Sequence, residues 1–164
     1  MNELKKIVNY NIHPLNSLEY KNNCNQKLKK NSVLILNNFL LSPALRNIQK
    51  EAHQLHSKAF YCSQKHTVLL NKKNSKLEDS DPCNIEVTSD KGCVPNDLIS
   101  PNSDLSIIYN SVDFIQFLET ALGVKKIYPY ADSLSSINYN YYEQNQQLGW
   151  HFDNASFAIT LMIK

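Results

Sequence analysis

The chain has 164 residues, a hydrophobic content of 42% and a formal net charge of +2. This length suits a single domain over residues 1–164, and the composition is that of a globular protein rather than a disordered chain. The charge is too small to indicate a nucleic-acid partner, and no apolar run approaches the roughly 20 residues that span a bilayer. We therefore expect neither a nucleic-acid partner nor a membrane partner.

Two helices and a strand are predicted in the first part of the chain. A short helix is expected near residues 18–28, and the apolar run at residues 33–36 predicts a buried strand. A Ser-Pro pair at residues 42–43 suits the start of a second helix. The apolar residues of that helix recur at three- and four-residue spacing: Leu45, Ile48, Ala52, Leu55 and Ala59. His53 and His56 lie one turn apart on it, and without a third ligand nearby we expect surface histidines rather than a metal pair.

Residues 71–104 form the longest stretch without a hydrophobic pattern. A loop of this length in a compact domain is a lid, a binding loop or a disordered segment. His66 opens a short apolar segment at residues 67–70, which we predict to be a strand. Gly92 is one of only three glycines, which indicates that the backbone requires a glycine at this point.

A further helix is predicted over residues 112–122, with Ser111 as its cap and Gly123 as its stop. The predicted order of elements is strand, helix, loop, helix and then strands, which suits an α+β domain. In that domain the N-terminal helices back a partial double-stranded β-helix, a relative of the jelly roll. We therefore predict a helical and loop lead-in over residues 1–125 and the first jelly-roll strands over residues 126–164.

Four cysteines are spread along the chain at Cys24, Cys62, Cys83 and Cys93. None forms a Cys-x-x-Cys pair, and no two have zinc-finger spacing. We expect isolated thiols in a reducing cytoplasm, and the alternative is a disulfide or a metal site.

The C-terminal part of the chain carries the strongest chemical signal. We predict a strand over residues 136–142, a polar turn, a corner at residues 148–153 and a strand over residues 157–163. Side chains at i and i+2 of an extended segment point the same way, so His151 and Asp153 can reach one metal ion. An imidazole and a carboxylate at this spacing make two-thirds of the 2-His-1-carboxylate facial triad, which holds non-haem Fe(II). Without its context, the pattern also fits a surface pair on a turn.

This C-terminal run resembles the Fe(II)/2-oxoglutarate-dependent oxygenases, and more closely a bacterial group of free-amino-acid hydroxylases and halogenases. The likeness rests on Asn140-x-Tyr142, on residues 148–153 (Leu-Gly-Trp-His-Phe-Asp) and on the aromatic Phe157. It extends upstream through residues 91–93, 121–124 and 128–132, and it covers residues 32–164 in order. One departure is the family's turn glycine, which is Asn145 here, a residue that also tolerates a left-handed backbone.

The resemblance implies a cofactor set and a substrate class. Iron would be bound by His151 and Asp153. Tyr142 would donate its hydroxyl to 2-oxoglutarate, with Asn140 as a second cofactor contact, and the alternative for Tyr142 is a role in the core. The substrate would be a free amino acid or a similar small polar molecule. Halogenases of this class replace the carboxylate with a small residue, so Asp153 favours hydroxylation.

The family's second iron-binding histidine and its 2-oxoglutarate-clamping arginine follow the His-x-Asp motif, but residues 154–164 contain neither. The only arginine is Arg46, on a predicted helix. We therefore expect the chain to be the N-terminal portion of an oxygenase, inactive alone, with residues 157–163 as an open strand edge that favours self-association. The resemblance also places His66 near the active site. The alternative function is that of a catalytically dead β-sandwich remnant acting as an interaction module.

Overall fold

The computed structural model describes residues 3–132 and 134–163. These residues form four α-helices and one open, three-stranded antiparallel sheet, so the predicted mixture of helix and sheet is confirmed. They divide into two compact units. The helical unit comprises residues 3–54, 95–132, 134–138 and 163, and the sheet unit comprises residues 55–94 and 139–162. Within these ranges no helix is both long and apolar enough to cross a membrane.

The helices of the helical unit are α1 (Leu18–Asn31), α2 (Ser42–Leu55), α3 (Asp104–Asn110) and α4 (Val112–Leu122). Serine side chains cap three of them, because the hydroxyl oxygen accepts a hydrogen bond from a backbone N–H that has no partner within the helix: Ser17, Ser103 and Ser111. At the end of α4, Gly123 adopts a left-handed backbone with φ of 72°. The helix over residues 112–122 and both of its end signals are therefore confirmed, as is a helix beginning at residue 18.

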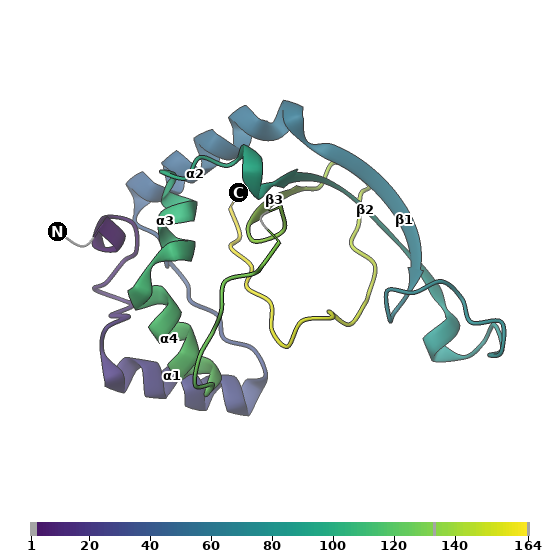
Figure 1. Cartoon of the computed structure of the whole chain (residues 1–164), viewed down its shortest axis with the longest axis horizontal. Helices are drawn as coiled ribbons and strands as arrows, with labels where there is room; N and C mark the ends of the chain where they lie inside the picture. The colour runs from purple at the N-terminus through teal and green to yellow at the C-terminus, as the bar shows by residue number, and fades with distance from the viewer. Residues whose placement is uncertain (1–2, 133, 164) are drawn as a thin grey trace. The chain divides into compact units, whose positions relative to one another are not determined.

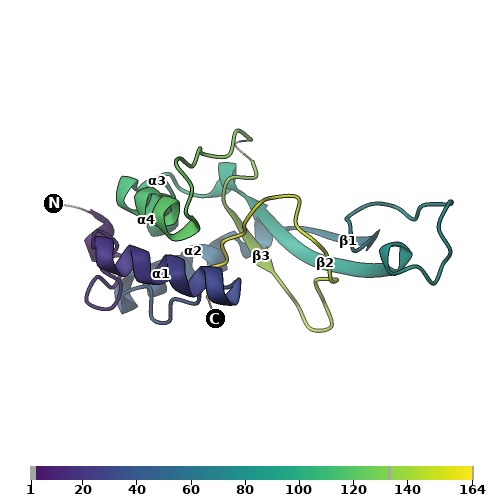
Figure 2. The ribbon, with the colours of Figure 1, turned by 90° about the horizontal axis from the view of Figure 1, so that it is seen from below.

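Aromatic packing between α1 and α4 forms the core of the helical unit. The two helices lie side by side (Figures 1 and 2). Phe117 on α4 is only 1% exposed, and its ring stacks on that of Tyr20 on α1 with centroids 6.0 Å apart. Phe114 extends this packing to Phe39, whose ring centroid is also 6.0 Å away. Offset aromatic pairs of this kind add stabilisation beyond the area they bury.

A buried histidine ties the segment before α1 to this core. His13 is 5% exposed, and both of its ring nitrogens are hydrogen-bonded. Its Nε2 lies 2.8 Å from the carbonyl oxygen of Asn37, and its Nδ1 lies 2.6 Å from the hydroxyl of Tyr20. Because a carbonyl only accepts, Nε2 carries the proton, and Nδ1 of the neutral ring accepts from the Tyr20 hydroxyl.

Replacing His13 with alanine is expected to lower the free energy of unfolding by about 3 kcal/mol, because the change removes two hydrogen bonds of a buried side chain and opens a cavity. Chemical denaturation followed by circular dichroism measures this loss. The matched control is His53→Ala on the exposed surface of α2, for which a change within about 0.5 kcal/mol is expected. Equal stabilities of the two variants would contradict the structural role of His13.

The sheet unit is built on β1 (Phe60–Thr67), β2 (Glu86–Pro95) and β3 (Asn138–Tyr141), in the order β1-β2-β3. The strands β1 and β2 pair antiparallel along their length, from Phe60 opposite Cys93 to Thr67 opposite Glu86 (Figure 1). The connection between them is folded around Asn84, which is 2% exposed. The side chain of Asn84 accepts from the backbone N–H of Asn74 at 2.7 Å and donates to the carbonyl of Glu78 at 3.2 Å.

The pairing register places the side chains of β1 and β2 on two opposite faces of the sheet. Side chains alternate along a strand, and residues directly opposite one another share a face. One face, here called the site face, carries His66 and Gln64 of β1 and Ser89 of β2. The opposite face carries Tyr61 and Gly92, which are paired. The Tyr61 ring covers the bare backbone of Gly92, since a Cβ atom there would lie 2.7 Å from Tyr61 Cζ.

Several predicted strands are wrong. Residues 33–36 are irregular rather than a buried strand, and Ile35 is 73% exposed because no neighbouring strand pairs with this segment. Residues 157–163, the expected edge strand, are irregular as well (Figure 1, yellow). At residues 67–70 the chain turns, so His66 and Thr67 end β1 rather than open a strand.

The predicted lead-in over residues 1–125 also contains more than helix and loop. Both long strands lie within it, and β2 occupies part of residues 71–104, where only irregular chain was expected. These strands are polar and carry few apolar residues, so the alternation that marks a half-buried strand is missing. The single open sheet of the described residues is not the closed arrangement of a double-stranded β-helix, which stays a prediction.

Candidate metal site

The candidate site is a corner of irregular chain that lies against β2 in the sheet unit. After β3 the chain turns through Asn145, which has a left-handed backbone with φ of 71°. This is the position at which the resembled family has a turn glycine. The chain then returns along the same edge of β2, where the backbone N–H of Asp90 donates to the carbonyl of Gln147 at 2.8 Å. At its far end, the N–H of Phe152 donates to the carbonyl of Val68 just beyond β1, also at 2.8 Å. The corner is therefore fixed to both long strands.

His151 and Asp153 meet at this corner, as their spacing predicts. The Nε2 atom of His151 lies 3.3 Å from Oδ1 of Asp153. On the other side of the ring, Nδ1 lies 2.7 Å from the carbonyl oxygen of Gly149. A carbonyl only accepts, so Nδ1 carries the proton and donates it to Gly149. In the neutral ring, the Nε2 lone pair is thus directed toward the carboxylate.

This geometry fits two positions of a metal centre. Nitrogen and oxygen ligands lie roughly 2.1 Å from a bound divalent metal, so two ligands at an angle of about 90–105° are about 3.0–3.3 Å apart. Two electron-rich atoms at 3.3 Å repel each other unless a positive charge lies between them, and either a proton or a metal ion supplies it. Over residues 3–132 and 134–163, no group of three His, Cys, Asp or Glu side chains is placed to hold a metal. His151 and Asp153 are here called the half-site, because their 3.3 Å contact could supply two ligands to one ion.

His66 lies directly beside the half-site. It is 8% exposed, and its ring stands nearly perpendicular to that of His151, with centroids 5.8 Å apart. Both ring nitrogens are engaged: Nδ1 lies 2.8 Å from the carbonyl of Thr67, and Nε2 lies 2.7 Å from Oγ of Ser89. The resemblance placed His66 near the active site, and the structure places it against His151, whose own role stays a prediction. Its occupied nitrogens give it the role of a supporting residue rather than a ligand.

Gly149 is required because the corner approaches β2 closely. A Cβ atom at Gly149 would lie 2.8 Å from the backbone oxygen of Thr88 and 2.7 Å from a methyl carbon of Val87. Backbone atoms of a paired strand cannot move aside, so any side chain at this position forces the corner away from the sheet. The lack of space for a side chain therefore explains why a glycine precedes Trp150 and His151.

Gly149→Ala is expected to displace the corner, with a loss of about 1–3 kcal/mol in the free energy of unfolding and a shift of the His151 imidazole resonances. Thermal unfolding and heteronuclear NMR of the histidine rings measure the two effects. The matched control is Gly92→Ala, whose clash is with the mobile end of the Tyr61 ring. A smaller loss and an unchanged His151 signal are expected there. If Gly149→Ala leaves the His151 resonances in place, the close approach does not position the histidine.

The two residues predicted to bind 2-oxoglutarate, Asn140 and Tyr142, lie in and directly after β3. Tyr142 directly follows β3 and is 48% exposed. Its pKa is raised, first by desolvation and second by the charge of the Cys93 thiolate, which places its phenol near Cys93. Asn140 is exposed on β3 and alternates with the buried Tyr139. Cys93 is four residues from Ser89, or ~13 Å along a strand, so the structure does not gather the cofactor residues and the half-site at one point.

The other sequence candidates lie away from the half-site. His56 bonds to the hydroxyl of Tyr61 at 2.9 Å and packs edge-on against the ring of Tyr141, so it belongs to an aromatic cluster on the opposite face of the sheet. His53 is exposed on α2. All four cysteines are free. The supporting residue that the sequence gave no reason to suspect is Ser89, because it lies in a segment without a strand pattern.

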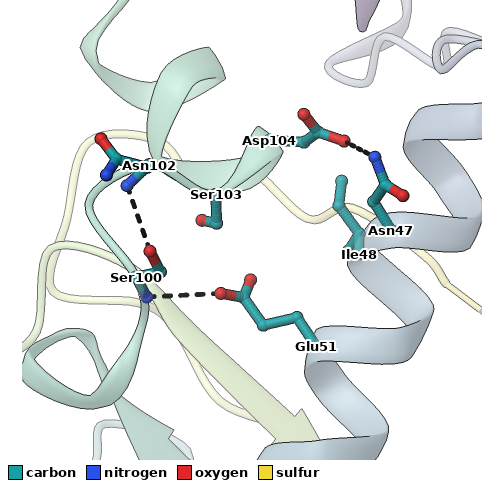
Figure 3. Close-up of a pocket in the computed structure, with 7 residues that line it drawn as sticks. All are labelled: Asn47, Ile48, Glu51, Ser100, Asn102, Ser103 and Asp104. Carbon is teal, nitrogen blue, oxygen red and sulfur yellow. Dashed lines mark hydrogen bonds between the residues drawn. The ribbon is translucent and has the colours of Figure 1, made fainter.

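A separate polar hollow of about 200 Å³ lies in the helical unit (Figure 3). Its lining residues are Asn47, Ile48, Glu51, Ser100, Asn102, Ser103 and Asp104. The polar groups there satisfy one another: Asn47 donates to Asp104 at 2.9 Å, and the Ser100 N–H donates to Glu51 at 3.3 Å. None of the predicted site residues lines this hollow.

Comparisons with known protein families, with curated proteins and with solved structures gave no significant match for this chain.

Proposed function

We propose that His151 and Asp153 are two of the three protein ligands of a non-haem Fe(II) centre. The chain would then form part of an Fe(II)/2-oxoglutarate-dependent oxygenase. The observation that carries the proposal is the 3.3 Å separation of Nε2 and Oδ1, with the imidazole tautomer set by the Gly149 carbonyl. Holding the far nitrogen of a metal-binding histidine with a carbonyl is typical of metal sites. The proposal also requires a third protein ligand and an arginine that clamps 2-oxoglutarate; among the described residues, no third His, Cys, Asp or Glu is grouped with this pair.

The proposed reaction is hydroxylation of a free amino acid or a similar small polar molecule. Iron and 2-oxoglutarate together supply the activation of O₂. One oxygen atom enters the substrate C–H bond as a hydroxyl, and the other leaves in succinate as 2-oxoglutarate loses CO₂. Tyr142 and Asn140 are the proposed cofactor contacts, and the carboxylate of Asp153 favours hydroxylation over halogenation. The four free thiols suit a reducing cytoplasm, and a double-stranded β-helix is the fold that accompanies this proposal.

The metal proposal predicts weak but specific binding of Mn(II), a redox-stable substitute for Fe(II). Two ligands hold an ion less tightly than a complete triad, and His151→Ala or Asp153→Ala removes one of the two. Each variant is expected to reduce the affinity at least tenfold in an anaerobic titration followed by the EPR signal of free Mn(II). His53→Ala is the matched control and should bind as the original chain does. Identical affinities in all four proteins would exclude a metal ion at this corner.

The cofactor proposal predicts that Tyr142→Phe weakens 2-oxoglutarate binding about tenfold or more, because one hydrogen bond to a carboxylate contributes about 1.5–3 kcal/mol. Equilibrium dialysis with Mn(II) present measures the affinity. Tyr128→Phe is the matched control, since Tyr128 is 72% exposed and lies outside the sheet unit. Unchanged binding by Tyr142→Phe would assign the tyrosine to packing alone.

A second candidate function is that of an interaction module without catalysis. Exposed aromatic side chains next to His151 in the chain favour it: Trp150 and Phe152 are 86% and 70% exposed. In addition, β1 is an outer strand of the sheet and can pair with another chain. Metal-independent self-association in sedimentation experiments supports this function, whereas loss of Mn(II) binding in His151→Ala supports the oxygenase.

A further inference from the structure

A continuous chain of hydrogen bonds runs from the buried His66 to the proposed iron ligand His151. Oγ of Ser89 lies 2.7 Å from Nε2 of His66 and 2.9 Å from the backbone nitrogen of Gly149. The carbonyl of the same Gly149 accepts from Nδ1 of His151 at 2.7 Å. The backbone of Gly149 is thus held by its N–H on the sheet side, and its C=O, which belongs to the next peptide group, accepts from the ring of His151.

The chemistry of each group gives every bond in this chain a direction. The Gly149 N–H can only donate, so Ser89 Oγ accepts from it. The Thr67 carbonyl can only accept, so His66 Nδ1 carries a proton and donates it there at 2.8 Å. In the neutral ring, His66 Nε2 is then an acceptor, and the hydroxyl proton of Ser89 points to it. Each of these donors and acceptors therefore has a hydrogen-bond partner.

Burial makes a reversal of these hydrogen-bond directions unfavourable. His66 is 92% buried (8% exposed), and Thr67, which accepts its proton, is 2% exposed. The bond from Nδ1 to the Thr67 carbonyl is buried, so exchanging the roles of donor and acceptor would leave a buried carbonyl facing a lone pair. The perpendicular contact between the rings of His66 and His151 also limits how the second ring can turn.

We propose that His66 and Ser89 are positioning residues for the half-site. His66, as the neutral Nδ1–H tautomer, orients the Ser89 hydroxyl, and Ser89 anchors the backbone of Gly149, whose carbonyl orients the His151 imidazole. The assignment of His151 as a metal ligand rests on the proposed function, whereas the placement of its ring by Ser89 does not. Neither positioning residue touches the metal or the reacting atoms.

The first test needs neither a variant nor a metal. Long-range ¹H–¹⁵N correlation spectra of the 164-residue chain, with histidines assigned by single substitution, report which ring nitrogen carries the proton. Protonation of Nδ1 alone is expected for both His66 and His151. If His66 carries its proton on Nε2 alone, the direction of the whole chain is reversed and the proposal is overturned.

The second test compares variants of two serines from the same sheet. Ser89→Ala removes both bonds of the hydroxyl, Ser89→Thr keeps the hydroxyl, and Ser63→Ala changes an exposed serine on the opposite face. In metal-free samples, Ser89→Ala is expected to convert His151 to a mixture of tautomers, while Ser89→Thr and Ser63→Ala retain Nδ1–H. An Nδ1–H tautomer of His151 that persists in Ser89→Ala would overturn the positioning role.

Mn(II) titration of the same proteins separates the two proposals. Removing a residue that orients a metal-binding histidine typically lowers metal affinity by about 10–100-fold. A loss in this range is expected for Ser89→Ala, and Ser89→Thr is expected to restore the affinity. If the original chain shows no Mn(II)-induced broadening of His151, the proposed function fails, and the metal-free tautomers still decide the positioning role. If Mn(II) broadens His151 equally in the original chain and in Ser89→Ala, the half-site stands and Ser89 does not position it.

Discussion

The hydrogen bond from Nδ1 of His151 to the carbonyl of Gly149 is the interaction on which the proposed metal site depends. It leaves Nε2 as the nitrogen that faces Asp153. Without it, the ring would be free to turn, and a histidine and an aspartate two residues apart would be an ordinary surface pair. With it, two electron-rich atoms are held at a separation that suits a shared cation.

The sheet supplies what this bond requires. The carbonyl of Gly149 accepts from His151, and the N–H of the same residue, in the preceding peptide group, donates to Ser89 on β2. The close approach of Gly149 to Thr88 allows no side chain at that point. The polar strands β1 and β2, which bury few apolar side chains, thus have a clear role: they provide the hydroxyl, the carbonyl groups and the buried imidazole that support the corner.

Local signals in the sequence predicted the helices well and the strands poorly. Ser111 and Gly123 mark the ends of α4 because capping and left-handed termination depend on neighbouring residues alone. By contrast, β1 and β2 form through pairing of residues that lie far apart in sequence, and their polar composition hides the alternation. The apolar run at residues 33–36 was misleading because hydrophobicity without a pairing partner makes no strand. The contact between His151 and Asp153 could be predicted from their spacing, but the bond between Ser89 and Gly149 could not, since it exists only in the folded register.

The central claim is that one imidazole and one carboxylate of this corner bind a divalent metal together. Pulsed EPR of the chain loaded with Mn(II) tests it most directly, because the coupling of the electron spin to a ligand nitrogen reports whether an imidazole is bound. The account predicts a signal from a single imidazole nitrogen that disappears in His151→Ala and persists in His53→Ala. A nitrogen coupling that survives in His151→Ala, or the absence of any such coupling in the original chain, would contradict it.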